Sequence, residues 1–410
     1  MNIWIFNHYA VAPGTNGGTR HYDLAKQLVK RGHNVTIFAS SFNHQSRKDL
    51  YLEDHSEEFK TTYYDGVRFV WVKSFPYQKN DWRRAYNMVS YTKNAYKIVK
   101  QFDEMPDVVI GSLVHPFAAY LGYLVAKKKG CRFYFEERDL WPQTLLDLGK
   151  VSERNPLIWV LGKMELFLYE KADRIVVLFN KAPNYVVSRG VKREKVMYLP
   201  NGVDLSRYEK QSDEMLPELQ QVLGRLDDKF VAVYTGAHGL ANNLDTVLDA
   251  AKMVKKKDEQ IHFLLVGDGP EKARLEKRKV DEGIDNVTFF PPVPKEQIPL
   301  ILQRVNVGLL PLTDSPVFKW GISPNKMFDY MASSLPVILL CNITESPVEL
   351  SGGGVVIKEN FTENLASSLL EMNATDDAHV KGQKARQYVE SNHSWDVLSK
   401  QLEQQMLQDI

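Results

Sequence analysis

Cysteine is scarce in this 410-residue chain, which contains only Cys131 and Cys341. The two lie far apart and lack metal-ligand spacing, so the sequence excludes a disulfide framework and favours a reducing, cytoplasmic setting. No apolar stretch approaches the roughly 20 residues that a membrane-spanning helix requires. Residues 1–14 begin with apolar side chains but have neither a basic lead nor a long apolar core, so we expect no signal peptide.

A surplus of charge is also missing, because 52 Lys and Arg side chains are balanced by 51 Asp and Glu side chains, a formal net charge of +1. This balance argues against a dedicated nucleic-acid partner. The two halves nevertheless differ: residues 1–200 carry 30 basic and 20 acidic side chains, whereas residues 201–410 carry 22 and 31. A net of +10 against −9 predicts that the halves face different partners, although uneven surface composition explains the same numbers.

Strand-like and helical stretches alternate along the whole chain. The first 40 residues are typical of one β-α-β unit, with strands at 2–6 and 34–39 around a helix at 17–31. The other strands that we expect are 68–72, 107–111, 132–135, 174–178, 195–198, 230–235, 261–266, 287–290, 307–310, 336–340 and 354–357. We expect further helices at 243–257, 270–282, 325–334, 362–372 and 377–408, the last with a break near 391–394.

Proline, glycine and charged residues interrupt this alternation at 200–217, which we interpret as the connection between two domains. The sequence predicts one domain at 1–200, a second at 201–385, and a C-terminal helix at 386–410 that packs back toward the first domain. Each domain is expected to be an α/β, Rossmann-like, doubly wound parallel sheet. The strand ends of both domains are expected to face a cleft.

Glycine-rich loops follow three of the expected strands: PGTNGGTR at 13–20, YTGAHGLANN at 234–243 and VGDGPEKARL at 266–275. Such a loop ahead of a helix brings backbone N–H groups close to an anion, and the helix dipole adds to the attraction. None of the three matches a P-loop or the G-x-G-x-x-G fingerprint, and each alone is equally typical of a surface loop. Together, at strand ends, they predict a phosphorylated ligand.

The order of the segments is more specific than any single motif. GGTRHYDLAKQLVKRGHNVTIFAS, followed by PNGVD, VGDGP, NVTFFPPVP and SPNKMFDYMASSLPVI, resembles retaining glycosyltransferase family 4, which has the GT-B fold. EERDLWP at 136–142 and SPNKMFDYMA at 323–332 look most like bacterial N-acetylfucosamine transferases of O-antigen and capsule assembly. The resemblance implies retaining transfer from a UDP-sugar, such as UDP-N-acetylfucosamine, to a lipid-linked or oligosaccharide acceptor. It assigns the acceptor to domain 1–200 and the donor to domain 201–385, in the cytoplasm or at the inner face of the cytoplasmic membrane.

The family usually carries two glutamates separated by seven residues, and here the second corresponds to Asp329 while Gly321 stands in place of the first. By resemblance Asp329 binds the ribose hydroxyls, although an acid near a helix start also stabilises the helix dipole. Lys326 begins the same helix, where a lysine is unfavourable unless solvent or an anion such as a diphosphate compensates its charge. The predicted donor-binding residues are Gly17, Gly18, Arg20, Gly236, His238, Gly239, Asn242, Gly267, Val293, Ser323, Pro324, Asn325, Lys326 and Asp329.

The segment EERD at 136–139 follows an expected strand and places three acids around one arginine. Such clusters perturb pKa values at functional sites, although a structural ion-pair cluster is the alternative. We predict that Arg138 and Asp139 take part in catalysis together with Lys326. The resemblance places His115 close to the transferred sugar, with a packing role as its alternative. Because the chain contains no D-x-D motif, we expect neither a metal ion nor a cofactor.

The segment 79–100 mixes basic with aromatic side chains, including Arg83 and Arg84. This composition suits an anionic membrane surface or a lipid-diphosphate acceptor. A solvated amphipathic helix is an equally good interpretation.

Two other functions remain open from the sequence. One is a UDP-sugar 2-epimerase of the same architecture, which would alter the donor without an acceptor. The other is a non-catalytic nucleotide-sugar-binding protein, in which Gly321 would mark lost activity.

Overall fold

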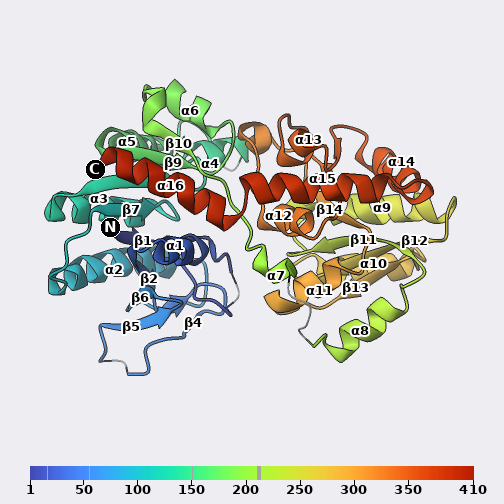
Figure 1. The fold of residues 1–410 in the computed structure, drawn as a ribbon, viewed down its shortest axis with the longest axis horizontal. Helices are drawn as coiled ribbons and strands as arrows, with labels where there is room; N and C mark the ends of the chain where they lie inside the picture. The colour runs from blue at the N-terminus through green and yellow to red at the C-terminus, as the bar shows by residue number, and fades with distance from the viewer. Residues whose placement is uncertain (16, 55, 150, 210–213) are drawn as a thin grey trace. The chain divides into compact units, whose positions relative to one another are not determined.

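The computed structural model describes residues 1–15, 17–54, 56–149, 151–209 and 214–410. It divides into two compact units, the first comprising Met1–Pro200 and Trp395–Ile410 and the second Asn201–Ser394 (Figure 1). Asn16 of the first glycine loop and residues 210–213 of the expected connection lie outside the described residues. Each unit has its own sheet and its own apolar core.

The first unit is built on an eight-stranded sheet of order β10-β9-β8-β7-β1-β2-β6-β5. Its strands are β1 (Asn2–Phe6), β2 (Asn34–Ser40), β5 (Phe59–Tyr64), β6 (Val67–Val72), β7 (Val108–Ser112), β8 (Arg132–Glu137), β9 (Arg174–Val177) and β10 (Val196–Tyr198). The strands expected in this half are confirmed to within two residues at either end. β1 pairs in parallel with β2 and β7, so that Ile3 is aligned with Val35 on one side and Val108 on the other.

The sheet is parallel, as expected, except at one edge, where β5, a strand that the sequence analysis did not predict, pairs antiparallel with β6. Asp65 and Gly66 join the two strands with positive φ at both residues, which is the geometry of a tight hairpin. The sequence FKTTYY of β5 alternates between half-buried and exposed positions. Its polar side chains suit an edge strand and explain why a search for apolar runs missed it. A separate two-stranded sheet consists of β3 (Phe42–Asn43) and β4 (Lys48–Asp49).

The first unit includes one helix from the far end of the sequence. Its helices are α1 (Arg20–Lys30), α2 (Trp82–Ile98), α3 (Pro116–Lys129), α4 (Gln143–Asp147), α5 (Pro156–Lys171), α6 (Ala182–Ser188) and α16 (Trp395–Asp409). The last of these, α16, packs against α1 and buries Trp395, Leu398 and Leu402 in the core of this unit (Figure 1). The break expected near 391–394 is confirmed, since α15 (Asp377–Asn392) ends just before it. The boundary predicted at 386 is wrong, because residues 386–394 belong to the second unit.

The second unit is built on a wholly parallel sheet of order β13-β12-β11-β14-β15-β16. Its strands are β11 (Phe230–Thr235), β12 (Ile261–Val266), β13 (Val287–Phe290), β14 (Val307–Pro311), β15 (Val337–Leu340) and β16 (Gly354–Ile357). Its helices, besides α15, are α7 (Ser206–Glu209), α8 (Pro217–Gly224), α9 (Leu244–Lys255), α10 (Lys272–Asp281), α11 (Ile298–Leu302), α12 (Asn325–Ala332), α13 (Pro347–Ser351) and α14 (Phe361–Ala374). The strands and helices expected here are confirmed to within two residues.

Both sheets reverse their strand order at one point. In the second unit the reversal falls between β11 and β14, and in the first unit it falls between β1 and β7. Ligands of open α/β sheets bind outside the carboxyl ends of the strands at such a point, because the connecting helices diverge there and leave a crevice. The chain segments that follow these four strands are therefore where each unit offers a site.

The packing of α12 against β14 sets the position of the helix whose second residue is the predicted Lys326. A Cβ at Gly308 in β14 would lie 2.4 Å from the ring of Tyr330 in α12, so only glycine lets the helix approach this closely. The Tyr330 hydroxyl also accepts a hydrogen bond of 2.8 Å from the Thr235 N–H at the end of β11. These contacts hold α12 against β14 and beside the carboxyl end of β11.

The return of α16 to the first unit predicts a measurable contribution to stability. Leu402 is buried in the core, and replacing it by alanine should lower the free energy of unfolding by about 2–5 kcal/mol through lost contacts and a cavity. Leu407 on the same helix is 60% exposed, so Leu407→Ala should change it by no more than about 0.5 kcal/mol. Urea denaturation followed by circular dichroism measures both; equal effects would contradict the packing of α16.

Candidate functional site

Lys326 is the central charged residue at the strand-order reversal of the second unit. Its Nζ donates a 2.8 Å hydrogen bond to the Tyr234 hydroxyl and lies 4.0 Å from the centroid of the same ring. Burial lowers the pKa of Lys326 to about 7, and the nearby Asp329 carboxyl raises it only in part. Lys326 is the second residue of α12, and this helix has no side-chain N-cap. An ammonium group at the positive end of a helix therefore lacks a full counter-charge, which is a setting that favours a bound anion.

The predicted glycines of this unit allow the backbone to approach the lysine closely. A Cβ at Gly236 would lie 2.6 Å from Lys326 Nζ, and a Cβ at Gly267 would lie 1.9 Å from the Gly236 carbonyl oxygen. Both glycines have φ values above +130°, which side-chain-bearing residues rarely adopt. The two glycine turns after β11 and β12 are thus stacked backbone to backbone beside the ammonium group.

His238 lies in the first of these turns and is fully buried. Among the described residues, neither ring nitrogen has a hydrogen-bond partner. Burial lowers the pKa of His238 to about 4, and the positive charges of Lys272 and Lys326 lower it as well. The Asp268 carboxyl raises this pKa and so opposes them. A buried imidazole without partners is costly unless a ligand supplies them, so its environment supports the predicted place at a ligand site.

Lys272 is a site residue that the sequence reasoning missed. It is the first residue of α10, and its Nζ donates a 2.9 Å hydrogen bond to the Gly267 carbonyl oxygen. It lies in the third glycine loop, VGDGPEKARL. The sequence did contain a signal that could have identified it, because Lys272, like Lys326, is a lysine at the start of an expected helix. Its charge adds to the positive potential around His238.

Asp329 is held by a 2.7 Å hydrogen bond that Tyr208 donates to its Oδ1. Burial raises the pKa of Asp329, whereas the Tyr208 hydroxyl and the charges of Lys295 and Lys326 lower it. Gly321, which replaces the first family glutamate, is buried with φ +104° and ψ 178°. Only glycine adopts this backbone conformation readily, so a glutamate could not occupy the position without strain.

The remaining predicted donor residues of the second unit surround the same turns. Ser323 is buried, and its hydroxyl and carbonyl oxygens accept hydrogen bonds from Asn201 at 2.8 and 2.6 Å, which anchors the start of α12. Asn242 donates to the Ala237 carbonyl oxygen at 2.8 Å and so braces the first glycine turn. Gly239 lies in that turn, Pro324 and Asn325 begin α12, and half-buried Val293 packs against the core after β13.

The EERD segment ends β8 in the first unit, where its first two acids are buried. Glu136 accepts hydrogen bonds from Arg20 at 2.9 Å, His21 at 2.6 Å and Ser112 at 2.7 Å. Arg20 also donates to the carbonyl oxygens of Pro200 at 2.5 Å and Leu199 at 2.9 Å. Because its guanidinium group is buried and engaged in this way, Arg20 is better explained as a structural residue than as the donor-binding residue that we predicted.

Glu137 belongs to a second buried network. Burial raises its pKa well above the usual range, and the nearby Glu165 carboxyl raises it further. Its Oε2 accepts a 2.6 Å hydrogen bond from Tyr169. Arg138 and Asp139 follow in the loop, where burial of the Asp139 carboxyl raises its pKa and the Arg138 charge opposes that effect. The structure places both at a carboxyl strand end, and their catalytic role stays a prediction.

His115 follows β7 and caps the N-terminus of α3. Its Nδ1 accepts the Ala118 N–H at 3.3 Å, and its Nε2 lies 2.7 Å from His8 Nδ1. Since an accepting Nδ1 leaves the proton of a neutral imidazole on Nε2, His115 donates to His8. Burial and the charge of Arg84 lower the pKa of His115 to about 3. Both ring nitrogens of His115 take part in hydrogen bonds within the protein, as the packing role requires. The catalytic role of His115 stays a prediction.

A cavity of about 190 Å³ adjoins this histidine pair through His8 and is lined mainly by the segments that follow β1 and β2. Gly17 and Gly18, which we had assigned to donor binding, line it together with His8, Tyr9 and Arg138. The structure thus brings the first glycine loop together with the EERD segment inside one unit.

The adjacent Arg83 and Arg84 differ in their surroundings. Arg83 forms a 3.0 Å ion pair with Asp81 and lies 5.2 Å above the ring of the exposed Trp82. Arg84 is half-buried, and its charge lowers the pKa values of His8 and His115. One arginine therefore belongs to the surface of α2 and the other to the neighbourhood of the cavity.

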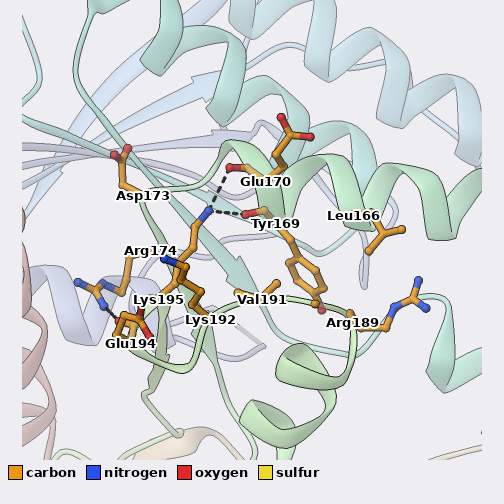
Figure 2. A pocket seen from close by; sticks show the side chains of 11 residues that line it. Leu166, Tyr169, Glu170, Asp173, Arg174, Arg189, Val191, Lys192, Glu194 and Lys195 are labelled. Carbon is orange, nitrogen blue, oxygen red and sulfur yellow. Dashed lines mark hydrogen bonds between the residues drawn. The ribbon is translucent and has the colours of Figure 1, made fainter.

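A cavity of about 520 Å³ lies elsewhere in the first unit, near the start of β9 (Figure 2). Figure 2 shows the Lys195 ammonium group donating to the carbonyl oxygens of Tyr169 and Glu170, at 2.6 and 3.0 Å. The guanidinium groups of Arg174 and Arg189 are likewise paired, with Asp409 and Glu165. This cavity adjoins the amino end of its strand, and none of the predicted site residues lines it.

Within the described ranges, His, Cys, Asp and Glu side chains form no group of three that could hold a metal ion, and metal independence stays a prediction. In the same part of the chain, every helix is too short or too polar to cross a bilayer.

Two family models match the chain, one in each unit. Residues 15–207 match Glycosyltransferase Family 4, and residues 229–374 match Glycosyl transferases group 1. The colanic acid biosynthesis glycosyl transferase WcaI of Escherichia coli (strain K12) is 24% identical over 293 residues, which cover 70% of this chain and 71% of that protein. The teichuronic acid biosynthesis glycosyltransferase TuaH of Bacillus subtilis (strain 168) is 24% identical over 211 residues, 48% of this chain and 50% of that protein.

Solved structures resemble the whole chain. Sucrose-phosphate synthase from Thermosynechococcus elongatus matches with a TM-score of 0.75 and 15% identity, covering 99% of this chain and 98% of that one. HepE of Anabaena in complex with UDP matches with a TM-score of 0.69 and 15% identity over the full length of both chains. At these identities the structures show the fold, while the family models show the class of enzyme. The two parallel-sheet units and the two family matches together identify the chain as a glycosyltransferase of the GT-B fold.

Proposed function

We propose that this glycosyltransferase transfers a hexosyl group from a UDP-sugar to a lipid-linked or oligosaccharide acceptor, with retention of configuration, in the assembly of a bacterial surface polysaccharide. The observation that carries the proposal is the incompletely compensated ammonium group of Lys326 beside two stacked glycine turns. A donor diphosphate would supply the missing negative charge. UDP-N-acetylfucosamine is one candidate donor by resemblance.

Each group around Lys326 has a place in this mechanism. As the bond between the sugar and the diphosphate breaks, negative charge grows on the departing phosphate, where Lys326 and the backbone amides of the α12 start stabilise it. His238 would donate to the diphosphate, and Asp329 would accept from the ribose hydroxyls. With no carboxylate pair at glycosidase spacing in the sequence, the acceptor hydroxyl would attack on the face from which the diphosphate leaves.

The names of similar proteins support the biological context. WcaI and TuaH are named for colanic acid and teichuronic acid biosynthesis, and HepE was crystallised with UDP. Those substrates and pathways are properties of the named proteins. They make a nucleotide-sugar donor and a polysaccharide acceptor the natural first choices for this chain.

The decisive experiment incubates the purified chain with a panel of UDP-sugars, with and without a lipid-linked sugar acceptor. We expect UDP release that depends on the acceptor, a product that keeps the anomeric configuration by proton NMR, and no turnover in Lys326→Ala. Lys277→Ala, which removes an exposed lysine paired with Asp281, is the matched control and should keep full activity. Interconversion of the donor alone would indicate an epimerase, and binding without turnover would indicate a non-catalytic protein.

The lowered pKa of Lys326 predicts a pH-dependent donor affinity. In the free protein the ammonium group loses its proton as the pH rises through about 7, and a bound diphosphate raises its pKa. Below that pH Lys326 is already protonated when the donor binds. Above it, donor binding requires Lys326 to take up a proton, which weakens the affinity. We expect the affinity for UDP-glucose to fall roughly tenfold between about pH 7 and about pH 8.5. Calorimetry measures this; a Lys326→Met variant should show a flat profile, and a flat wild-type profile would contradict the assignment.

The composition of α2 supports a peripheral location at the inner face of the membrane. Trp82 is 65% exposed beside Arg83, and such pairs of an aromatic ring and a cation suit an anionic lipid surface. We expect the chain to float with vesicles containing phosphatidylglycerol, and Trp82→Ala with Arg83→Gln to reduce the floated fraction several-fold. Val280→Ala removes an apolar side chain of similar exposure from the second unit and should have no effect. A floated fraction that does not depend on the phosphatidylglycerol content of the vesicles would contradict the membrane role of α2.

A further inference from the structure

The PNGVD motif leads into a short helix that contacts the donor site of the second unit. Asp204 Oδ1 accepts hydrogen bonds from the Ser206 N–H at 3.1 Å and from the Ser206 hydroxyl at 2.7 Å, which fixes the start of α7. Two residues further along, the Tyr208 hydroxyl donates to Asp329 Oδ1 in α12. The segment that the motif begins therefore contacts a residue that we assign to the nucleotide.

The segment 201–208 is anchored to α12 and to the residues just ahead of it, and all of these contacts lie within the second unit. Asn201 forms two hydrogen bonds with Ser323, at 2.8 and 2.6 Å. The Asn201 carbonyl oxygen also lies 3.3 Å from His393 Nδ1. The His393 ring stacks on Phe328 of α12, with 4.4 Å between the ring centroids. Because the segment is held in this way ahead of α7, the protein itself sets the position of the tyrosine hydroxyl that follows.

The Tyr208 hydroxyl restricts the rotation of the Asp329 carboxylate. The last torsion of an aspartate side chain has broad, twofold minima, so the position of the residue on its helix does not by itself orient the two oxygens. Tyr208 donates to Oδ1 at 2.7 Å, and among the described residues Oδ2 accepts no hydrogen bond. With Oδ1 held, the lone pairs of Oδ2 keep a defined direction for a hydroxyl group that donates to them.

The same hydroxyl helps to keep Asp329 ionised. Burial raises the pKa of Asp329, and the hydrogen bond from Tyr208 is the largest of the effects that lower it. The positive charges that face this carboxylate, on Lys295, Arg207 and Lys326, act in the same direction as Tyr208. A hydrogen bond to a carboxylate stabilises its charged form, and an ionised carboxylate only accepts hydrogen bonds. The orientation and the charge of Asp329 therefore both suit a ligand group that donates, such as a sugar hydroxyl.

We propose that Tyr208 is a positioning residue of the donor site, which orients the Asp329 carboxylate toward the ribose hydroxyls of the nucleotide. The inference rests on the proposed function, which gives Asp329 its contact with the ribose. A purely structural role is the alternative, because the Tyr208 ring also packs against the core of the second unit. The two roles differ in what the hydroxyl group does, since the ring alone is enough for packing.

The test is calorimetric titration of the 410-residue chain with UDP and with 2′,3′-dideoxy-UDP, which lacks both ribose hydroxyls. We expect the wild type to bind UDP more tightly. Tyr208→Phe keeps the ring and removes only the hydroxyl, so it should weaken UDP binding about tenfold and leave the affinity for dideoxy-UDP within about twofold. Tyr388→Phe is the matched control, because Tyr388 on α15 packs against the same core, and it should change neither affinity.

A double-variant cycle with Asp329→Asn tests whether Tyr208 acts through Asp329. In the Asp329→Asn background, adding Tyr208→Phe should weaken UDP binding no further, because the carboxylate that the hydroxyl orients is gone. Equal weakening of both nucleotides by Tyr208→Phe, an unchanged affinity for UDP, or additive effects of the two substitutions would overturn the proposal. Equal binding of both nucleotides by the wild type would also overturn it, while leaving intact the sugar transfer that Lys326 supports. A wild type that binds neither nucleotide would contradict the proposed function and this inference with it.

Discussion

A reversal of strand order constrains everything that each unit of this protein can do. At that point two neighbouring parallel strands send their following segments in opposite directions, and a crevice opens at their carboxyl ends. In the second unit the reversal falls between β11 and β14, and Lys326, the glycine turns and His238 lie in the segments beyond these strands and their neighbour β12. In the first unit the reversal falls between β1 and β7, and the bonded pair His8 and His115 lies in the segments that follow these two strands. The chemistry differs between the units, but the geometric reason for its location is the same.

The sequence predicted the elements well wherever apolar side chains repeat with the period of a buried strand or a helix. Every strand of the second unit follows that rule because the sheet is covered on both faces and its residues are almost continuously apolar. The rule fails for β5, where burial is only partial and threonine and tyrosine alternate. The sequence analysis also placed the domain boundary at 386, inside α15, which continues to Asn392. The residues of a helix give no local signal of the unit against which the helix packs, so the true boundary at Ser394 was missed.

The site was predictable where backbone geometry restricts the residue type, and less so where tertiary contacts decide. Gly236 and Gly267 are required by a close approach that only glycine allows, and a glycine-rich loop is visible in sequence. Arg83 and Arg84 have different surroundings because consecutive residues of an α-helix point about 100° apart. The sequence alone does not tell which face of α2 packs against the rest of the unit. The same is true of Arg20, whose buried contacts with Glu136 come from a strand more than a hundred residues away.

The return of α16 has a consequence for the order in which the chain acquires its structure. The core of the first unit combines residues from the first 200 positions with Trp395, Leu398, Leu402 and Met406. The second unit, Asn201–Ser394, needs no residue outside its own continuous segment. During synthesis the segment translated first therefore keeps part of its core open until α16 has left the ribosome, whereas the segment translated second is complete before α16. In this protein the second unit is a single insertion that can finish folding ahead of the unit that encloses it in sequence.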